Sequence, residues 1–356
     1  MKHKAKLLLR EFYARLLWHT GLWRLVDRLS PRRLTILAGH CVAEASCNGA
    51  LPADMKVDGE RLEGWLRALG KRFALVNVQD GWARLLGGDK GPSFVALSMD
   101  DGYRDNRTAL LPILARTGAS ATVYLESRPL LERRVSWSHK YFWLLNEGGF
   151  DPDRLGRTYL AGCSDVDSAE RLRRVLEEGG DLAYLIKRVF KYESPAEERD
   201  RVIDEVFVAA GGDESALCER IYMDSDDVLA LASAGVELGG HTARHEVQRT
   251  LSAEGQAADV NEGRDGLHSL LGHQLGQTFA YPFGRRWDWD EHTVASVREA
   301  GFQAAVTTHA GTNLPDADPM RLKRWMIDDD TKLHHLVAEA CGGFQLLRRF
   351  GLELAE

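Results

Sequence analysis

Residues 93–102 read Ser-Phe-Val-Ala-Leu-Ser-Met-Asp-Asp-Gly, an apolar run that ends in two aspartates and a glycine. The run follows Gly91-Pro92, and its length and composition predict a buried β-strand. Residues 106–117 have helical spacing and end at Gly118, and a second β-rich run covers 119–125. A strand, a helix and a strand in this order predict an α/β fold around a parallel sheet or barrel.

The alternation resumes in the second half of the chain after a long interruption. Residues 127–222 are charged and helix-like, which predicts a helical insertion into one body that spans 34–330 rather than a separate domain. The elements predicted after the insertion are a helix at 226–234, strands at 236–239, 278–281 and 302–307, a helix at 291–300, and a C-terminal helix within 331–356.

The composition is that of an ordinary globular protein. The 356 residues include 46 Lys and Arg against 53 Asp and Glu, a formal charge of −7, and 44% of them are hydrophobic. These values argue against a disordered chain and against a general nucleic-acid binder, which needs a basic face. No uncharged apolar run approaches the roughly 18 residues of a membrane-spanning helix.

The cysteines are five in number and scattered, so they predict neither a disulfide framework nor a CxxC metal site. We therefore expect a reducing, cytoplasmic location. The five are Cys41, Cys47, Cys163, Cys218 and Cys341.

Residues 1–33 depart from the charge of the whole chain. They contain nine Lys and Arg against Glu11 and Asp27, and apolar residues recur at helical spacing. The charges interrupt any signal-peptide core, so we expect an amphipathic helix. Packing of this helix on the main domain is the favoured interpretation. The alternative is a helix on an anionic membrane surface, with Trp18 and Trp23 at the interface, which would make the protein peripheral at the inner membrane surface.

Two carboxylates follow the first strand. Asp100 and Asp101 lie where β/α barrels and sheets display reactive groups, at the carboxyl end of a strand. Neighbouring carboxylates raise one another's pKa unless a cation is close. A solvated turn, with one aspartate capping the next helix, is the alternative.

Two histidines follow a later strand. His241 and His245 come directly after Gly239-Gly240, and their His-x-x-x-His spacing is common among metal ligands. Two polar loop histidines are the alternative. Combined with one carboxylate, the pair would provide three protein ligands and an open position, the pattern of a catalytic metal.

A third segment, residues 278–284, reads Thr-Phe-Ala-Tyr-Pro-Phe-Gly. Proline and glycine around an aromatic residue predict a rigid loop that can aim a backbone N–H group, although an ordinary strand-ending turn would have the same sequence.

With Asp-Asp-Gly, His-x-x-x-His and Tyr-Pro-Phe-Gly in this order, the chain resembles the polysaccharide deacetylase family, also called carbohydrate esterase family four. The likeness includes Ala121–Leu125 and Gly301–Thr308, and it covers residues 93–127 and 223–327. Three motifs in order at strand ends make a chance match improbable. The resemblance implies a distorted (β/α) barrel and metal-dependent hydrolysis of an N-acetyl group on a sugar.

The resemblance also implies roles for single residues. Asp101, His241 and His245 would hold a divalent metal, with zinc as the expected ion, and Asp100 would be the general base that takes a proton from water. The backbone N–H of Phe283 would stabilise the tetrahedral oxyanion.

The sequence departs from the family pattern in two places. Many members have an arginine before the Pro-aromatic-Gly loop, where this chain has Ala280 and Tyr281, and the position that matches a later family arginine is Arg324. A surface arginine is an equally good interpretation of Arg324. The second departure is the general acid, because no Leu-x-His motif is clear. His309 is the first candidate, with His334 and His335 as rivals.

Several residues are candidates for substrate contact. Trp287 and Trp289 follow the loop, and tryptophan faces stack on sugar rings, although tryptophans that brace the barrel would look the same. Tyr281 and Pro282 of the loop are further candidates, as is His40, which ends the predicted strand 34–38.

The sequence therefore predicts an N-deacetylase that acts on a glycan, a glycan precursor or a sugar-containing metabolite. A hydrolase of a non-sugar amide or cyclic imide is the alternative. Two histidines and a carboxylate also form the facial triad of non-haem iron oxygenases, but such chemistry needs no base like Asp100. A non-catalytic carbohydrate-binding protein is disfavoured because Asp100, Asp101, His241 and His245 are all present.

Overall fold

The computed structural model describes residues 2–43 and 50–352, and Cys47 lies outside this part. An eight-stranded sheet forms the centre, with the strand order β10-β1-β5-β6-β7-β8-β9, and β4 pairs with β5 outside this path. Every pairing in this sheet is parallel. The strands are β1 (Leu34–Gly39), β4 (Ala74–Val76), β5 (Phe94–Met99), β6 (Ala121–Leu125), β7 (Glu237–Gly240), β8 (Leu275–Ala280), β9 (Ala304–Val306) and β10 (Arg324–Met326).

The two ends of this strand order meet, so the sheet is a nearly closed barrel. Leu322, just before β10, forms a parallel bridge with Val306 of β9, and the Thr307 N–H donates to the Leu322 carbonyl at 2.8 Å. The predicted distorted (β/α) barrel is confirmed.

The strands are apolar runs because both of their faces are covered. Leu34 and Ile36 of β1 belong to a cluster inside the barrel with residues from five other strands, whereas Leu37 packs in an outer cluster with helix residues such as Leu62. Trp82 of helix α4 (Val78–Leu86) joins the inner cluster. The Val78 N–H donates to Thr122 Oγ1 at the start of β6, so α4 covers the amino end of the barrel.

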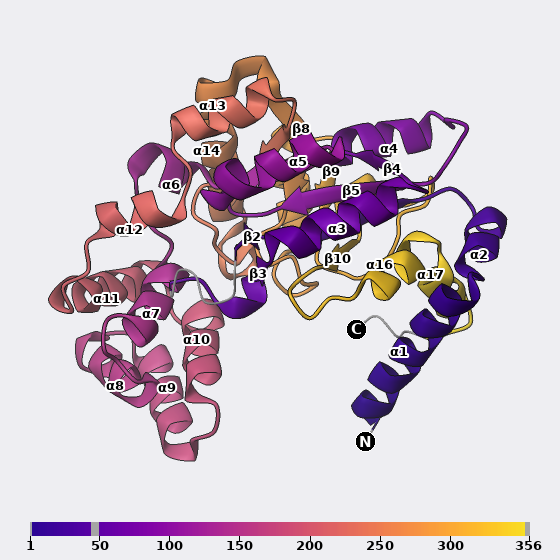
Figure 1. Cartoon of the computed structure of the whole chain (residues 1–356). Helices are drawn as coiled ribbons and strands as arrows, with labels where there is room; N and C mark the ends of the chain where they lie inside the picture. The colour runs from indigo at the N-terminus through magenta and orange to yellow at the C-terminus, as the bar shows by residue number, and fades with distance from the viewer. Residues whose placement is uncertain (1, 44–49, 353–356) are drawn as a thin grey trace.

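The helices around the barrel alternate with the strands (Figure 1). They are α3 (Gly59–Gly70), α4, a π-helical turn at Asn106–Leu110 that runs into α5 (Leu111–Thr117), α13 (Ser225–Ser233), α14 (Ala253–Leu271), α15 (Glu291–Glu299), α16 (Leu333–Ala340) and α17 (Gly343–Arg349). A small parallel pair, β2 (Cys41–Val42) and β3 (Lys56–Val57), follows β1. Short 3₁₀ turns lie at Ala53–Met55, Gln248–Thr250, Gly272–Gln274 and Pro319–Arg321.

The insertion between β6 and α13 is helical, as predicted, and has its own apolar core (Figure 1). That core includes Trp137, Tyr141, Tyr159 and Phe190. The inserted helices are α6 (Ser127–Glu132), α7 (Trp137–Asn146), α8 (Pro152–Gly162), α9 (Val166–Glu178), α10 (Leu182–Tyr192), α11 (Ala196–Ala209) and α12 (Glu214–Ile221).

Both chain ends differ from the single helices that the sequence predicted. Residues 1–33 form α1 (Lys2–Thr20) and α2 (Trp23–Leu29), because Gly21 between them has φ +72° and ends the first helix. The C-terminal segment likewise forms two helices, α16 and α17, separated at Gly342 with φ +83°. Helix α1 lies along α16, on the other side of the barrel from the inserted helices in Figure 1. No helix of the described residues is both long enough and apolar enough to span a bilayer.

Candidate active site

Three strand ends gather reactive side chains at the carboxyl edge of the sheet. Asp100 and Asp101 follow β5, His241 follows β7, and Tyr281 follows β8. Because all these strands are parallel, their carboxyl ends meet at one edge. The structure brings Asp101, His241 and His245 together, with one ligand atom of each within 4.8 Å of the others.

The atoms that face one another in this cluster are mostly acceptors. Asp101 Oδ1 lies 3.2 Å from His241 Nε2 and 3.4 Å from His245 Nε2, and this buried oxygen has no hydrogen-bond partner among the described residues. His241 Nδ1 donates to the Ala280 carbonyl at 2.7 Å, so the neutral ring turns the lone pair of Nε2 toward Asp101. Facing lone pairs in a buried site need a cation between them, either a proton or a metal ion.

The pKa values of the two histidines differ. Burial opposes protonation of His241, but the Asp101 and Asp100 carboxylates outweigh burial and raise its pKa. Burial dominates at His245 and lowers its pKa to about 3. The His245 ring therefore stays neutral at physiological pH, which is the form that binds a metal. A carboxylate and two imidazoles are a donor set that fits a divalent transition metal such as zinc.

The backbone holds these residues in unusual conformations. Of the five non-glycine residues with positive φ in the described part of the chain, four lie here: Asp101 (72°), Thr242 (66°), His245 (54°) and Phe283 (60°). Each such conformation costs on the order of 1–3 kcal/mol and is found mainly where function requires it.

Helix α14 supports the histidine loop by close packing. A Cβ atom at Gly263 would lie 2.5 Å from the Thr242 carbonyl carbon, so only glycine allows this approach. The Asp259 carboxylate of α14 accepts from the Arg244 N–H at 3.0 Å, and the Asp259 carbonyl accepts from the Ala243 N–H at 3.2 Å. Close packing and hydrogen bonds from α14 therefore fix the loop between the two histidines.

Asp100 has a different partner from Asp101. Arg324 Nη1 and Nη2 donate to its two oxygens at 2.6 and 2.8 Å, and the guanidinium is fully buried. Burial raises the pKa of Asp100, but Arg324 outweighs it and lowers the pKa below its usual value. Arg324 Nε also donates to the Thr307 carbonyl at 2.9 Å. Arg324 is thus a buried partner of the predicted base rather than a surface residue.

Comparisons with known proteins agree with the fold and with the part of the site that lies within residues 205–305. A family model described as polysaccharide deacetylase matches residues 205–305, which include both histidines and the loop after β8. No curated protein matches the chain in sequence. Among solved structures, the chain is similar to the deacetylase PplD from Streptococcus pyogenes, with a TM-score of 0.56 and 15% identity over 87% of this chain and 99% of that one.

Two further structures are similar in the same way. IcaB from Ammonifex degensii has a TM-score of 0.51 and 16% identity, over 88% of this chain and 98% of that chain. A polysaccharide deacetylase from Bacillus cereus has a TM-score of 0.53 and 12% identity, over 87% of this chain and 69% of that chain. At these identities the structural likeness concerns the fold, and the family match adds the sequence evidence.

Residues 205–305 thus match the polysaccharide deacetylase family, and the whole chain shares its fold with solved deacetylases. That match indicates an enzyme that hydrolyses an amide bond. This assignment favours a hydrolase over the iron oxygenase and the non-catalytic binding protein that the sequence left open.

Other residues that the sequence predicted for the site lie around the cluster. The Phe283 ring is 4.6 Å from the His245 ring, and its backbone N–H is used by no hydrogen bond among the described residues. His40 directly follows β1, and its carbonyl accepts from Asn106 Nδ2 at 3.1 Å. His309 lies two residues beyond Thr307, and its carbonyl accepts from the Arg324 N–H at 2.9 Å.

The aromatic candidates divide into packing residues and an exposed one. Tyr281 is fully buried, stacks on Trp289 with ring centroids 4.8 Å apart, and donates to the Met320 carbonyl at 3.0 Å. Pro282 is buried as well. As positioned, Tyr281 and Trp289 brace the loop rather than offer a face to a sugar. Trp287 is 45% exposed, and its Nε1 donates to Tyr192 Oη at 3.2 Å.

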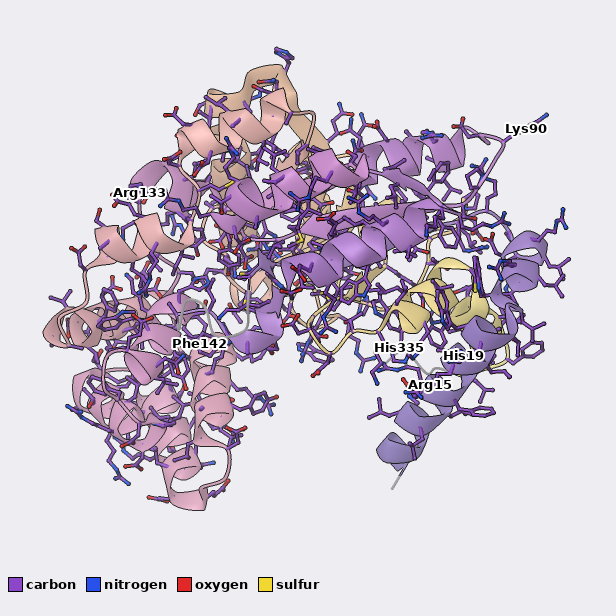
Figure 2. The ribbon with its side chains drawn as sticks, in the orientation of Figure 1. Arg15, His19, Lys90, Arg133, Phe142 and His335 are labelled. Atoms are coloured by element: carbon purple, nitrogen blue, oxygen red, sulfur yellow. The ribbon has the colours of Figure 1, made fainter. Side chains whose placement is uncertain are left out.

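The rival histidines lie in a different cluster. His334 and His335 contact Glu11 of α1 at 3.2 and 2.8 Å, and these three residues form a second group with metal-ligand spacing. Figure 2 labels His335 beside Arg15 of α1. Neither histidine belongs to the group around Asp101.

Sequence reasoning missed the residues that the insertion contributes. Lys191 of α10 lies 3.4 Å above the Phe283 ring centroid, and Tyr192 donates to the buried Asp288 at 2.8 Å. Tyr103, His139 and Tyr222 form a hydrogen-bonded group next to Asp101. Only Tyr103 had a local signal, since it follows Asp101 by two residues.

Proposed function

We propose that this protein removes the N-acetyl group of an amino sugar by metal-dependent hydrolysis. The observation that carries the proposal is the contrast between two adjacent carboxylates. Asp101 turns an unpartnered oxygen toward two imidazole nitrogens, while Asp100 is held ionised by Arg324. One carboxylate is thus suited to hold a cation and its neighbour to take a proton.

Asp101, His241 and His245 would hold the divalent cation, for which zinc is the proposed identity. Such an ion, when bound, supplies Lewis-acid chemistry that polarises a carbonyl and acidifies water. The buried Asp100 carboxylate accepts the proton that water loses as the water oxygen bonds to the acetyl carbon. The backbone N–H of Phe283 would donate to the oxyanion of the tetrahedral intermediate.

The C–N bond then breaks, and the leaving amine takes up a proton. His309 is the proposed donor, because it lies next to the Arg324 and Thr307 backbone that borders Asp100. The products are acetate and a free amino sugar. Trp287 is 45% exposed, and it is the proposed contact for a neighbouring sugar ring.

The test is acetate release by the zinc-loaded full chain from free, nucleotide-linked, lipid-linked and polymeric N-acetylamino sugars. The wild type is expected to release acetate from at least one of these, and Asp100→Asn is expected to lose a factor of about 10²–10⁴ in kcat while it retains zinc. Full activity of Asp100→Asn would refute the assignment of the base. Hydrolysis of cyclic imides or non-sugar amides alone would favour the alternative substrate class.

We also propose that residues 1–33 attach the protein to an anionic membrane surface. Helix α1 packs on the body through Ala14 and Leu17, but Leu8 and Phe12 on another side are 72% and 65% exposed. The exposed apolar residues continue on α2 with Leu29. This segment is basic although the whole chain has a formal charge of −7, so an anionic lipid surface is its complementary partner.

Co-sedimentation with vesicles of phosphatidylglycerol and phosphatidylcholine tests this attachment. Leu8→Glu with Phe12→Glu is expected to abolish binding. The matched control is Val166→Glu with Val208→Glu, which changes two exposed valines of the insertion and is expected to bind like the wild type. Equal binding by both double variants would refute the role of α1.

A further inference from the structure

Three aromatic rings form a buried group beside Asp101. Tyr103, His139 and Tyr222 are 0%, 4% and 3% exposed, and each ring centroid lies 5.5–5.6 Å from the other two. Tyr103 Oη lies 2.6 Å from Asp101 Oδ2 and 2.7 Å from His139 Nε2. Tyr222 Oη lies 2.9 Å from His139 Nδ1. The group thus leads without a break from Tyr222 to the Asp101 carboxylate.

If every buried polar atom of this group is to have a hydrogen-bond partner, the hydrogen bonds can run in only one direction. The single Tyr103 hydroxyl proton goes to the Asp101 carboxylate, which has no proton of its own to share. His139 Nε2 must then donate to Tyr103 Oη. His139 Nδ1 is left with a lone pair, which accepts the Tyr222 hydroxyl proton. Burial lowers the pKa of His139 to about 4, in agreement with this neutral tautomer.

The direction matters for the Asp101 carboxylate. Oδ2 is occupied by the Tyr103 hydroxyl, so the carboxylate cannot rotate to exchange its two oxygens without losing a buried charge-assisted hydrogen bond. Oδ1 consequently stays toward His241 and His245. One oxygen is fixed by the protein so that the other is available for a cation.

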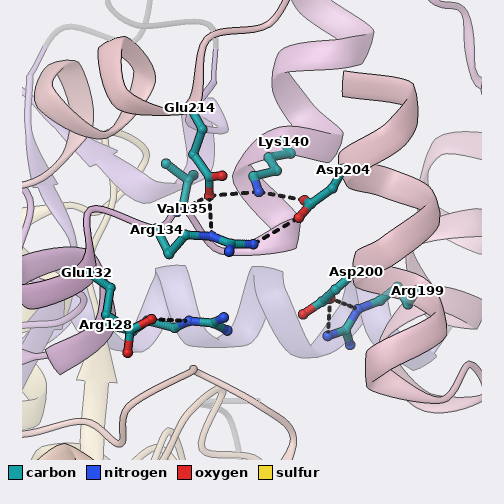
Figure 3. A network of polar contacts seen from close by, with 9 residues as sticks. All are labelled: Arg128, Glu132, Arg134, Val135, Lys140, Arg199, Asp200, Asp204 and Glu214. Atoms are coloured by element: carbon teal, nitrogen blue, oxygen red, sulfur yellow. Dashed lines mark hydrogen bonds and ion pairs between the residues drawn. The ribbon is translucent and has the colours of Figure 1, made fainter. Parts of the chain in front are cut away.

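The insertion provides both His139 and Tyr222, and it holds them firmly. His139 lies on α7, and its neighbour Lys140, which is 2% exposed, pairs with Asp204 at 2.5 Å and Glu214 at 2.8 Å. Figure 3 shows Lys140 between these two carboxylates, with Arg134 joined to the same pair. These contacts tie α7 to α11 and α12.

The end of the insertion is joined to the barrel motif itself. Tyr222 forms an antiparallel bridge with Tyr103, and the Arg104 N–H donates to the Ile221 carbonyl at 2.8 Å. The Met223 N–H donates to the Gly102 carbonyl at 3.1 Å. The Asp-Asp-Gly-Tyr turn is therefore clamped to the last residues of the insertion.

We propose that Tyr222, His139 and Tyr103 form a positioning relay through which the helical insertion orients the metal-ligating Asp101. This inference rests on the proposed function, in which Asp101 is a ligand. The three residues are positioning residues, because they act through Asp101. The insertion thereby contributes to the geometry of the metal site.

The test is the zinc affinity of the purified full chain, measured by competition with a chromophoric chelator. His139→Phe keeps an aromatic ring but removes both hydrogen bonds, and it is expected to weaken zinc binding about 10–100-fold, the usual effect of removing an outer-shell partner. His139→Gln, which can still donate to Tyr103, is expected to recover most of the affinity. Trp143→Phe on the same helix is the matched control and is expected to bind zinc like the wild type.

The thermal unfolding temperature of the metal-free variants separates positioning from general stability. If His139→Phe folds and binds zinc within twofold of the wild type, the relay is refuted. If His139→Phe does not fold, Tyr103→Phe decides in the same assay, with the same expected loss and the same refuting result. Asp101→Ala separates the two proposals. If this variant binds zinc as tightly as the wild type, Asp101 is not a ligand, and the proposed function is refuted independently of the relay.

Discussion

Two clusters in this molecule have the same donor set, one carboxylate and two histidines. Asp101, His241 and His245 lie at the carboxyl edge of the barrel, and Glu11, His334 and His335 lie between α1 and α16. In the first cluster, Asp101 Oδ1 is buried and has no hydrogen-bond partner among the described residues. In the second, Glu11 Oε1 already pairs with Arg15 at 2.5 Å and with Lys332 at 3.6 Å.

The difference is in the surroundings rather than in the ligands. The cations around Glu11 neutralise its charge and would repel a metal ion. At the barrel cluster, the described ion pairs of Asp100 and Asp101 include one arginine, Arg324, and it pairs with Asp100. The same three residue types thus form a candidate metal site in one place and an anchor for a helix in the other.

The largest expected effect is the loss of metal. His241→Ala removes a ligand whose Nε2 faces Asp101, so both bound zinc and turnover are expected to disappear. His335→Ala changes the equivalent residue of the other cluster and is expected to leave zinc stoichiometry and turnover unchanged. Elemental analysis of dialysed protein together with an acetate-release assay measures both. Zinc retained by His241→Ala and lost from His335→Ala would reverse the assignment.

A smaller effect is expected on stability, from the arginine beside each cluster. Arg324→Met leaves the Asp100 carboxylate buried without a partner and is expected to cost about 3–5 kcal/mol of unfolding free energy. Arg15→Met removes a mostly exposed partner of Glu11 and is expected to cost less than about 1 kcal/mol.

Denaturant unfolding of the metal-free proteins provides the comparison of the two arginines. Equal losses of unfolding free energy in the two variants would contradict the cost assigned to a buried Asp100 carboxylate without a partner.

A more local effect is a pH dependence of the α1 anchor. Burial lowers the pKa of His335 to about 4, and the Arg15 and His334 contacts lower that of Glu11 to about 2 against its own burial. As pH falls from about 6.5, His335 takes up a proton in the detached state but not in the docked state, so docking weakens until about pH 4. Protonation of detached Glu11 weakens docking further below about pH 4.5.

Each of these groups changes the docking equilibrium by at most about tenfold per pH unit. Hydrogen exchange of the α1 amides, corrected for intrinsic rates, measures this equilibrium. His335→Phe is the control and is expected to lose the dependence between pH 6.5 and 4. An α1 exchange rate that does not change over this range in the wild type would contradict the assignment.

The core of the barrel site could be predicted from the sequence because its information is local. A parallel sheet places every strand's carboxyl end at one edge, so residues that directly follow apolar runs, such as Asp101 and His241, must approach one another. Arg324 was suggested only by a family resemblance, and its pairing with Asp100 follows from the position of β10 beside β1.

The remaining contacts depend on packing between segments that no local pattern connects. His139 reaches Tyr103 from α7, and the neighbouring Lys140 pairs with Asp204 and Glu214 on other helices of the insertion. His335 meets Glu11 across 324 positions of the chain for a similar reason. Tyr281 and Trp289 look like sugar-binding aromatics in the sequence, but both are buried and stack on each other.

The most direct test of the central claim is anomalous X-ray diffraction at the zinc absorption edge from crystals of the zinc-loaded full chain. An anomalous peak is expected within bonding distance of Asp101 Oδ1, His241 Nε2 and His245 Nε2, and none is expected at Glu11. A peak between Glu11, His334 and His335, or His241 and His245 rings turned away from Asp101 with no peak there, would contradict it.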